Sequence, residues 1–116
     1  MGDIAYIASK DSLSAGPNNF AESATKADQV RLLAAELGEV GIRFSGVNPD
    51  GVVRAAANGV PGENLSEDHA QRTLLKRKVL PEHVTAAVFA LTGPDLAQSI
   101  GLHIPVDSGV AGAFLR

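Results

Sequence analysis

Three side chains near the amino terminus have the types and the spacing that could do chemistry: Ser9, Glu22 and Lys26. Ser9 lies thirteen residues before Glu22, and Lys26 follows Glu22 by four. A hydroxyl close to an amine is the arrangement of a Ser–Lys hydrolase dyad, in which the amine activates the nucleophile. No oxyanion-hole motif accompanies the pair, so hydrolysis has little support. Glu22 also has a structural interpretation, as a helix-capping residue that pairs with Lys26 one turn later.

The elements that must position these side chains are a strand, a loop and a helix. The apolar run Ile4–Ala8 is typical of a strand that is covered on both faces in a parallel sheet. A loop rich in Gly, Pro and Asn follows over residues 9–18. A helix is predicted over residues 19–38, because Asn19 can cap its start and Gly38 can end it.

The rest of the chain continues the alternation of strands and helices. Further strands are predicted at 42–48 and 102–106, and further helices near 66–78 and 81–92. The segment 54–64 between them is predicted to be a loop, and Ser66 is predicted to cap the helix that follows it. The order strand, helix, strand, helix, helix, strand predicts an α/β fold, a truncated Rossmann-like half with about three parallel strands and right-handed crossovers.

Length, composition and net charge exclude several classes of function. The chain of 116 residues is predicted to be a single domain, residues 1–116, and it contains no cysteine, which excludes disulfides and thiolate chemistry. No apolar run is long enough to span a membrane, and no signal peptide is recognisable. The net charge of −3 without a basic run argues against a nucleic-acid partner. A cytoplasmic protein is expected.

The three histidines do not predict a metal site. His69, His83 and His103 do not pair with one another at helical spacing, and a metal needs three or four convergent ligands. We expect His69 and His83 to be solvated helix positions and His103 to be a strand residue with one polar neighbour. No metal is expected.

Three carboxylates and one basic run are further candidates for chemistry. Asp3, Asp50 and Asp107 each lie near the end of a predicted strand, so a carboxylate pair is conceivable, but cap or turn roles are favoured. The run Lys76–Lys78 is interpreted as the solvated, dipole-matched end of the helix at 66–78 rather than as an anion site.

Several strings make the whole chain resemble the carboxyl-terminal half of a short-chain dehydrogenase/reductase. The resemblance is closest to the bifunctional rhamnulose-1-phosphate aldolase/alcohol (lactaldehyde) dehydrogenase proteins. The strings that carry it are GDIAYIASK, SATKADQ, RLLAAELGEVGIR, VNPDGVVR, QRTLLKR, LPEHV, AVFALTG and GLHIPVDSGVAGAFLR.

The resemblance implies a redox site in which Ser9 orients the substrate oxygen and Lys26 holds the nicotinamide ribose. The family has a tyrosine in a Tyr-x-x-x-Lys motif, whose phenol, with an ordinary pKa of about 10, works as the acid/base group. Glu22 occupies the position of that tyrosine. A carboxylate is ionised at neutral pH, so it cannot donate the proton that carbonyl reduction needs. The catalytic set Ser9, Glu22 and Lys26 is therefore interpreted as degenerate.

The cofactor site that the resemblance implies is also incomplete. Pro49, Asp50, Gly51 and Val52 match the segment that passes the nicotinamide. The Gly-rich phosphate-binding turn and the first four strands belong upstream of Met1 in the family, and none of the twelve glycines forms G-x-G-x-x-G. The family implies NAD(P), but no cofactor is expected to bind this chain alone. The substrate loop after Val53 looks shortened, and Ser45 replaces a common asparagine.

Three functional hypotheses remain open. The chain is a degenerate fragment without catalysis of its own, acting as an oligomerisation or interaction module. Alternatively, it is an NAD(P)-dependent oxidoreductase for a small alcohol or aldehyde, with the cofactor half supplied by another chain. As a third possibility, it is an engineered or excised piece of the fold. A homo-oligomer, most simply a dimer, is expected through the helix at 19–38 or the bare edge of the strand at 4–8.

Overall fold

The described part of the computed structural model consists of residues 2–9, 21, 24, 26, 29–53 and 62–110, with the backbone alone for residues 62–66. It contains one three-stranded sheet in the order β1-β2-β3. The strands are β1 (Gly2–Ile7), β2 (Ile42–Pro49) and β3 (His103–Val106). Both strand pairs are parallel, with Gly2 opposite Ile42 and Gly46 opposite His103. The predicted α/β fold with three parallel strands is confirmed.

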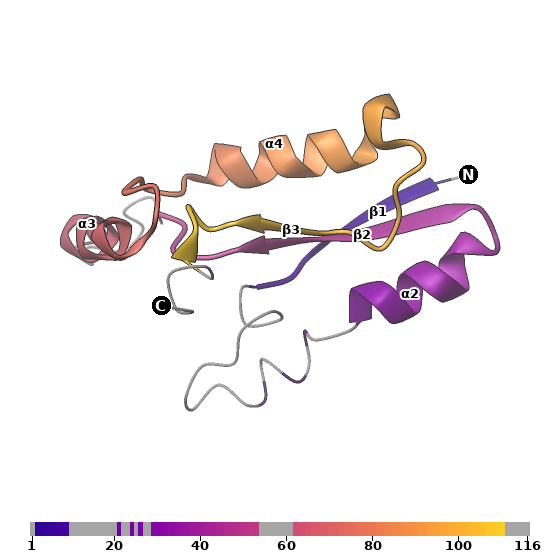
Figure 1. The fold of residues 1–116 in the computed structure, drawn as a ribbon, viewed down its shortest axis with the longest axis horizontal. Helices are drawn as coiled ribbons and strands as arrows, with labels where there is room; N and C mark the ends of the chain where they lie inside the picture. Colours follow the sequence, from indigo (N-terminus) through magenta and orange to yellow (C-terminus); the bar gives the residue numbers. More distant parts are fainter. Residues whose placement is uncertain are drawn as a thin grey trace.

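Two helices lie on opposite faces of the sheet. Figure 1 shows α2 (Gln29–Gly38) against one face and α4 (Pro81–Thr92) along the other. Ala21, Ala24 and Lys26 are also in helical conformation, so the predicted helix at 19–38 is correct wherever it is described. The central strand β2 is buried from Phe44 to Asn48 because it has a strand on each side and a helix over each face.

The hydrophobic core lies between α2 and the sheet. Val30 and Ala34 of α2 pack with Phe44 of β2, and the partly buried residues around this cluster are Tyr6, Leu33 and Leu37. The close approach of helix and strand requires Gly46, because a Cβ there would lie 2.7 Å from Cγ2 of Val30. The helical spacing of the apolar residues in α2 therefore identified the face that packs on the sheet.

Helix α4 has the boundaries that Pro81 at its start and Gly93 after its end predicted. Pro81 stands in its first turn, where a missing N–H costs nothing, and the Leu80 N–H donates to Nδ1 of His83 at 3.0 Å. The helix ends before Gly93, and a short 3₁₀ turn, η2 (Pro94–Leu96), follows.

Helix α3 (Gly62–Arg72) differs from the prediction, which had placed a helix at 66–78. The helix starts earlier than expected, inside the segment predicted to be a loop, so Ser66 is not its cap. It also ends earlier, because the Thr73 hydroxyl donates to the Ala70 carbonyl at 2.8 Å and Lys76 takes a positive φ of 54°. The Leu75 N–H then bonds to the Ser108 carbonyl after β3. A local hydrogen bond therefore closes this helix, and the contact with the distant Ser108 carries the chain away from its axis.

Strand β1 is less buried than its apolar sequence predicted. Ile4 is 43% exposed and Ile7 is 49% exposed, so the strand is not covered on both faces. β1 is an outer strand of the sheet that the described residues form, and its far edge lacks a neighbouring strand there.

Candidate functional site

The candidate catalytic residues start at the carboxyl end of β1. Ser9 lies two residues after the end of β1 and is half-buried, and its carbonyl accepts a 2.8 Å hydrogen bond from Nδ2 of Asn48. Lys26 is half-buried on the helical segment before α2. Glu22 lies outside the described residues, so its proposed roles as acid/base substitute and helix cap remain predictions.

The segment assigned to the nicotinamide by resemblance lies at the same edge of the sheet. Pro49 is the last residue of β2, and the Asp50 N–H bonds to the Val106 carbonyl of β3 at 3.3 Å. Val52 forms an isolated parallel bridge with Val79, and Gly51, between Asp50 and Val52, has a positive φ of 60°. Pro49–Val52 is therefore a turn held at the carboxyl ends of the strands, where open parallel sheets bind their ligands.

Asn48 is a central residue of this edge that the sequence analysis missed. It is fully buried, and its Oδ1 lies 3.3 Å from Nδ1 of His103 on β3. With the bond to Ser9, this side chain connects the end of β1 to β3 across β2. The signal that could have found it is an amide side chain at the end of the strand predicted at 42–48, since an amide that is buried in a sheet needs partners.

A second pair that the sequence analysis missed joins the turn after β2 to α3. Nε2 of His69 lies 3.3 Å from Oδ2 of Asp50, an ion pair when the imidazole is protonated. His69 was predicted to be a solvated helix position, which is wrong: its side chain is 31% exposed, and its ring packs on Gly51. Local patterns could not reveal a pair so far apart along the chain.

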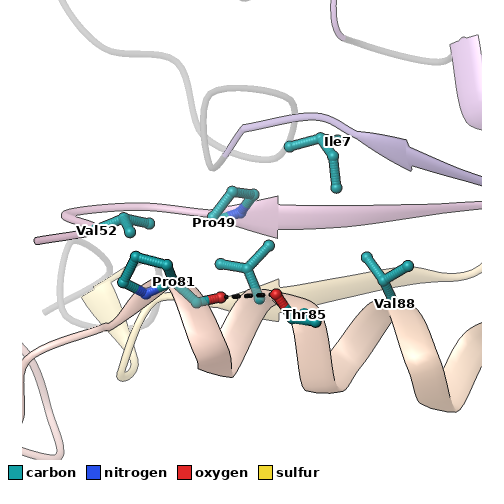
Figure 2. Close-up of a pocket in the computed structure, with 7 residues that line it drawn as sticks. Ile7, Pro49, Val52, Pro81, Thr85 and Val88 are labelled. Atoms are coloured by element: carbon teal, nitrogen blue, oxygen red, sulfur yellow. Dashed lines mark hydrogen bonds between the residues drawn. The ribbon is translucent and has the colours of Figure 1, made fainter. Parts of the chain in front are cut away.

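An apolar cavity opens between this edge of the sheet and α4. It has a volume of about 390 Å³ and is lined by Ile7, Pro49, Val52, Pro81, Val84, Thr85 and Val88. Figure 2 shows the side chains of the two strand ends facing the first turns of α4. The one polar side chain, Thr85, donates its hydroxyl to the Pro81 carbonyl at 3.2 Å, so the wall presents apolar surface.

The other candidates from the sequence have structural roles. Asp3 lies in β1 with its carboxylate 2.7 Å from Nε of Arg43, whereas Asp107 follows β3 and accepts the Gly109 N–H at 2.8 Å. Asp3 is thus near the amino end of its strand and Asp107 beyond the carboxyl end of another. His83 is exposed, and His103 has Asn48 as its polar neighbour, as predicted. Within the described ranges, no group of three or more metal-binding side chains is present.

The basic run Lys76–Lys78 follows α3 instead of ending it. Nζ of Lys78 lies 3.0 Å from Oε2 of Glu67. The hydrogen bond from Lys78, then its charge, then a hydrogen bond from Gln71 lower the pKa of Glu67. A lowered carboxyl pKa means that this contribution to stability is present above the ordinary pKa of glutamate and is lost as the pH falls through the lowered one. Because Glu67 is exposed, salt screens the pair.

These elements define an α/β protein whose candidate site, with Ser9, Asn48 and Asp50, lies at the carboxyl edge of a parallel sheet. Residues 1–111 match the family described as Enoyl-(Acyl carrier protein) reductase. The chain therefore belongs to the short-chain dehydrogenase/reductase family. No helix in the described part of the chain is long and apolar enough to cross a membrane.

Individual relatives agree with this assignment. The chain is 35% identical over 131 aligned positions to the uncharacterized oxidoreductase YuxG of Bacillus subtilis, covering 99% of this chain and 19% of YuxG. It is similar to a putative betaketoacyl-ACP reductase of known structure, with 28% identity, a TM-score of 0.75, and coverage of 95% of this chain and 47% of that one. The Bacillus cereus enoyl-acyl carrier protein reductase, solved with NADP+, shares the fold, with 24% identity, a TM-score of 0.78, and coverage of 95% and 45%. The chain thus spans half or less of the length of these relatives.

Proposed function

We propose that this chain is an interaction module derived from a short-chain dehydrogenase/reductase, without catalysis when it is alone. The observation that carries the proposal is the outer strand β1, whose Ile4 and Ile7 side chains are 43% and 49% exposed at the edge of a small parallel sheet. An apolar strand edge with unpaired backbone groups favours pairing with another segment. We propose the rhamnulose-1-phosphate aldolase/alcohol dehydrogenase proteins as the origin of the chain, because the strings named in the sequence analysis resemble that group.

The lack of catalysis is argued from two requirements of hydride transfer. A nicotinamide cofactor needs a site for its pyrophosphate, and the sequence has no Gly-rich turn of the required spacing. The reaction also needs a group that exchanges a proton, and Glu22 stands where the family has tyrosine. Loss of such a group costs about 10²–10⁴-fold in rate.

Calorimetry with NADH and NADPH tests this proposal. We expect the purified chain to bind neither cofactor at millimolar concentration, and we expect Glu22→Tyr to leave this result unchanged, because the missing pyrophosphate site remains missing. Saturable binding by the unmodified chain, or turnover of a small alcohol, would contradict the proposal.

The alternative is an oxidoreductase whose cofactor half comes from another chain. It is supported by Ser9 at the carboxyl end of β1, by the Pro49–Val52 turn, and by the 390 Å³ apolar cavity beside them. The cofactor of that complete site would be NAD(P), and the Bacillus cereus enoyl-acyl carrier protein reductase of similar fold was solved with NADP+. Activity that appears only when a dinucleotide-binding partner is added would favour this alternative.

For the partner of the module we propose a second copy of the chain. Either the edge of β1 or the helix that includes α2 can form the contact, and α2 has an exposed apolar side chain, Leu32, at 64%. Light scattering after size exclusion should give twice the chain mass of 12.0 kDa. Ile7→Lys should produce the monomer if β1 forms the contact, and Leu32→Lys should do so if the helix forms it.

A matched control for the edge variant is available. Ile100 lies before β3 and is 42% exposed, close to the exposure of Ile7. Ile100→Lys therefore makes the same chemical change away from β1 and should leave the dimer intact. A monomer in the unmodified chain would rule out self-association.

A further inference from the structure

The face of the sheet under α2 changes from apolar to polar toward the carboxyl end of β2. Residues of a strand alternate between the two faces, so Phe44, Gly46 and Asn48 face the same side. Phe44 packs against Val30 of α2, which identifies this side as the α2 face. The core thus ends in Asn48, an amide side chain with 0% exposure. A buried amide needs hydrogen-bond partners for its nitrogen and for its oxygen.

The hydrogen bonds of Asn48 have a fixed direction. Its Nδ2 donates to the Ser9 carbonyl at 2.8 Å. A backbone carbonyl carries no proton and can only accept, so the amide nitrogen must face Ser9. The amide oxygen Oδ1 then faces His103 on β3, and it lies 3.3 Å from Nδ1 of that ring. Because Oδ1 also can only accept, Nδ1 of His103 must carry the proton of this contact.

The contact between His103 and Asn48 lies beside the backbone of Gly46. Gly46 is opposite His103 in the register of β2 and β3. A Cβ on Gly46 would lie 3.7 Å from Nδ1 of His103, 3.8 Å from Oδ1 of Asn48 and 2.7 Å from Cγ2 of Val30. The imidazole and the amide therefore meet close to where α2 packs on the sheet. The bond is partly buried, so water competes less with it than at the surface.

We infer that His103 is a positioning residue for Ser9: in its neutral Nδ1–H form it donates to Asn48 and so orients the amide that donates to the Ser9 carbonyl. The two bonds run in one direction, from β3 through β2 to the end of β1, and Nε2 of His103 keeps its lone pair. The far strand β3 thus helps to fix the backbone of the candidate serine. The network lies within the chain and needs neither a cofactor nor a partner, so its failure would leave the proposed function untouched.

The position of the proton on His103 is the first test. NMR of the isotopically labelled full chain reads it from the shifts of the two ring nitrogens, at a pH where imidazoles are neutral. We expect the proton on Nδ1. His83 is an internal control with the opposite expectation, because the Leu80 N–H donates to its Nδ1 at 3.0 Å and the ring proton must then be on Nε2. A proton on Nε2 of His103 would overturn the inference.

Substitutions at position 48 test whether Asn48 sets this form of the ring. Asn48→Asp should keep the proton on Nδ1 of His103, because a carboxylate oxygen still accepts it. Asn48→Leu removes the acceptor, so the preference for Nδ1–H should be lost. If the ring keeps that preference in Asn48→Leu, the amide does not hold it and the inference fails.

Exchange of the Ala8 amide tests the positioning of the chain at Ser9. This amide donates to the Val47 carbonyl at 2.8 Å, directly before Ser9. His103→Leu removes the donor to Asn48 and should accelerate the exchange about fivefold, the usual effect of one hydrogen bond. His103→Asn should restore part of the protection, because its amide can place an N–H near the position of Nδ1. Exchange in α2 should stay unchanged in both variants.

The matched control is His83→Leu, the same chemical change at an exposed histidine whose bond stays at the start of α4. It should leave exchange at Ala8 unchanged. An unmodified rate at Ala8 in His103→Leu would contradict the positioning role, and so would a rate in His103→Asn as fast as in His103→Leu. Equal acceleration at Ala8 and throughout α2 would contradict it too, since His103 would then stabilise the whole fold.

Discussion

Phe44→Ala is expected to lower the free energy of unfolding by about 3–5 kcal/mol, the range for removing a buried aromatic side chain. Phe44 is 4% exposed in the central strand β2, and it packs against Val30 and Ala34 of α2. Its ring centroid lies 5.9 Å from that of Tyr6 on β1. The substitution therefore removes contacts to two elements at once and leaves a cavity where they meet.

The expected loss is large relative to the total free energy of unfolding of the chain. Small domains have a total stability of about 5–15 kcal/mol. The described residues form a sheet of three strands, and its outer strand β1 has exposed isoleucines, so we expect the stability of the chain to lie at the lower end of that range. Urea denaturation followed by circular dichroism should therefore show at most about 2 kcal/mol of stability for Phe44→Ala, so that it unfolds at low urea concentrations.

The same substitution at Phe89 is the control. Phe89 lies on α4 and is 79% exposed, so its ring is not part of the described core. Phe89→Ala should change the unfolding free energy by no more than about 0.5 kcal/mol. Equal losses at both positions would show that α2 and the sheet do not share the core described above.

The parts of the fold that the sequence predicted well have local causes. The strands were found because apolar runs of strand length stand between Gly, Pro and Asn residues. Helix α4 was found because Pro81 and Gly93 mark its ends and its apolar residues recur at helical spacing. In each case the signal and the structure lie in the same few residues.

The errors have causes that lie far along the chain. Helix α3 ends at Arg72, and three residues later the Leu75 N–H bonds to the Ser108 carbonyl after β3, a contact that no pattern within residues 66–78 indicates. The interpretation of His69 failed for the same reason, because Asp50 approaches it only after the chain has folded. The exposure of β1 depends on the number of strands in the sheet, which its own apolar sequence does not determine.

Asn48 shows what such distant contacts add to the candidate site, and its replacement gives the second large effect. Asn48→Leu keeps the size of the side chain but removes the donor to the Ser9 carbonyl at 2.8 Å and the partner of His103 at 3.3 Å. Leaving buried polar groups unsatisfied costs about 1–3 kcal/mol in stability. Since the bond fixes the backbone at the end of β1, exchange of the Ser9 amide should also accelerate.

Two further variants separate the contacts of Asn48. Asn48→Asp keeps an oxygen toward His103 and removes the donor to the Ser9 carbonyl. If amide exchange then accelerates at Ser9 and nowhere else, the acceleration is caused by loss of the bond between Asn48 and Ser9. Ser45→Ala is the control for loss of a buried polar side chain on the same strand, because its hydroxyl accepts the Leu102 N–H at 3.3 Å and is not bonded to Ser9. Ser45→Ala should destabilise the chain by about 1 kcal/mol and leave exchange at Ser9 unchanged. If Asn48→Leu were as stable as the unmodified chain and Ser9 exchanged no faster, Asn48 would not be what positions the candidate serine.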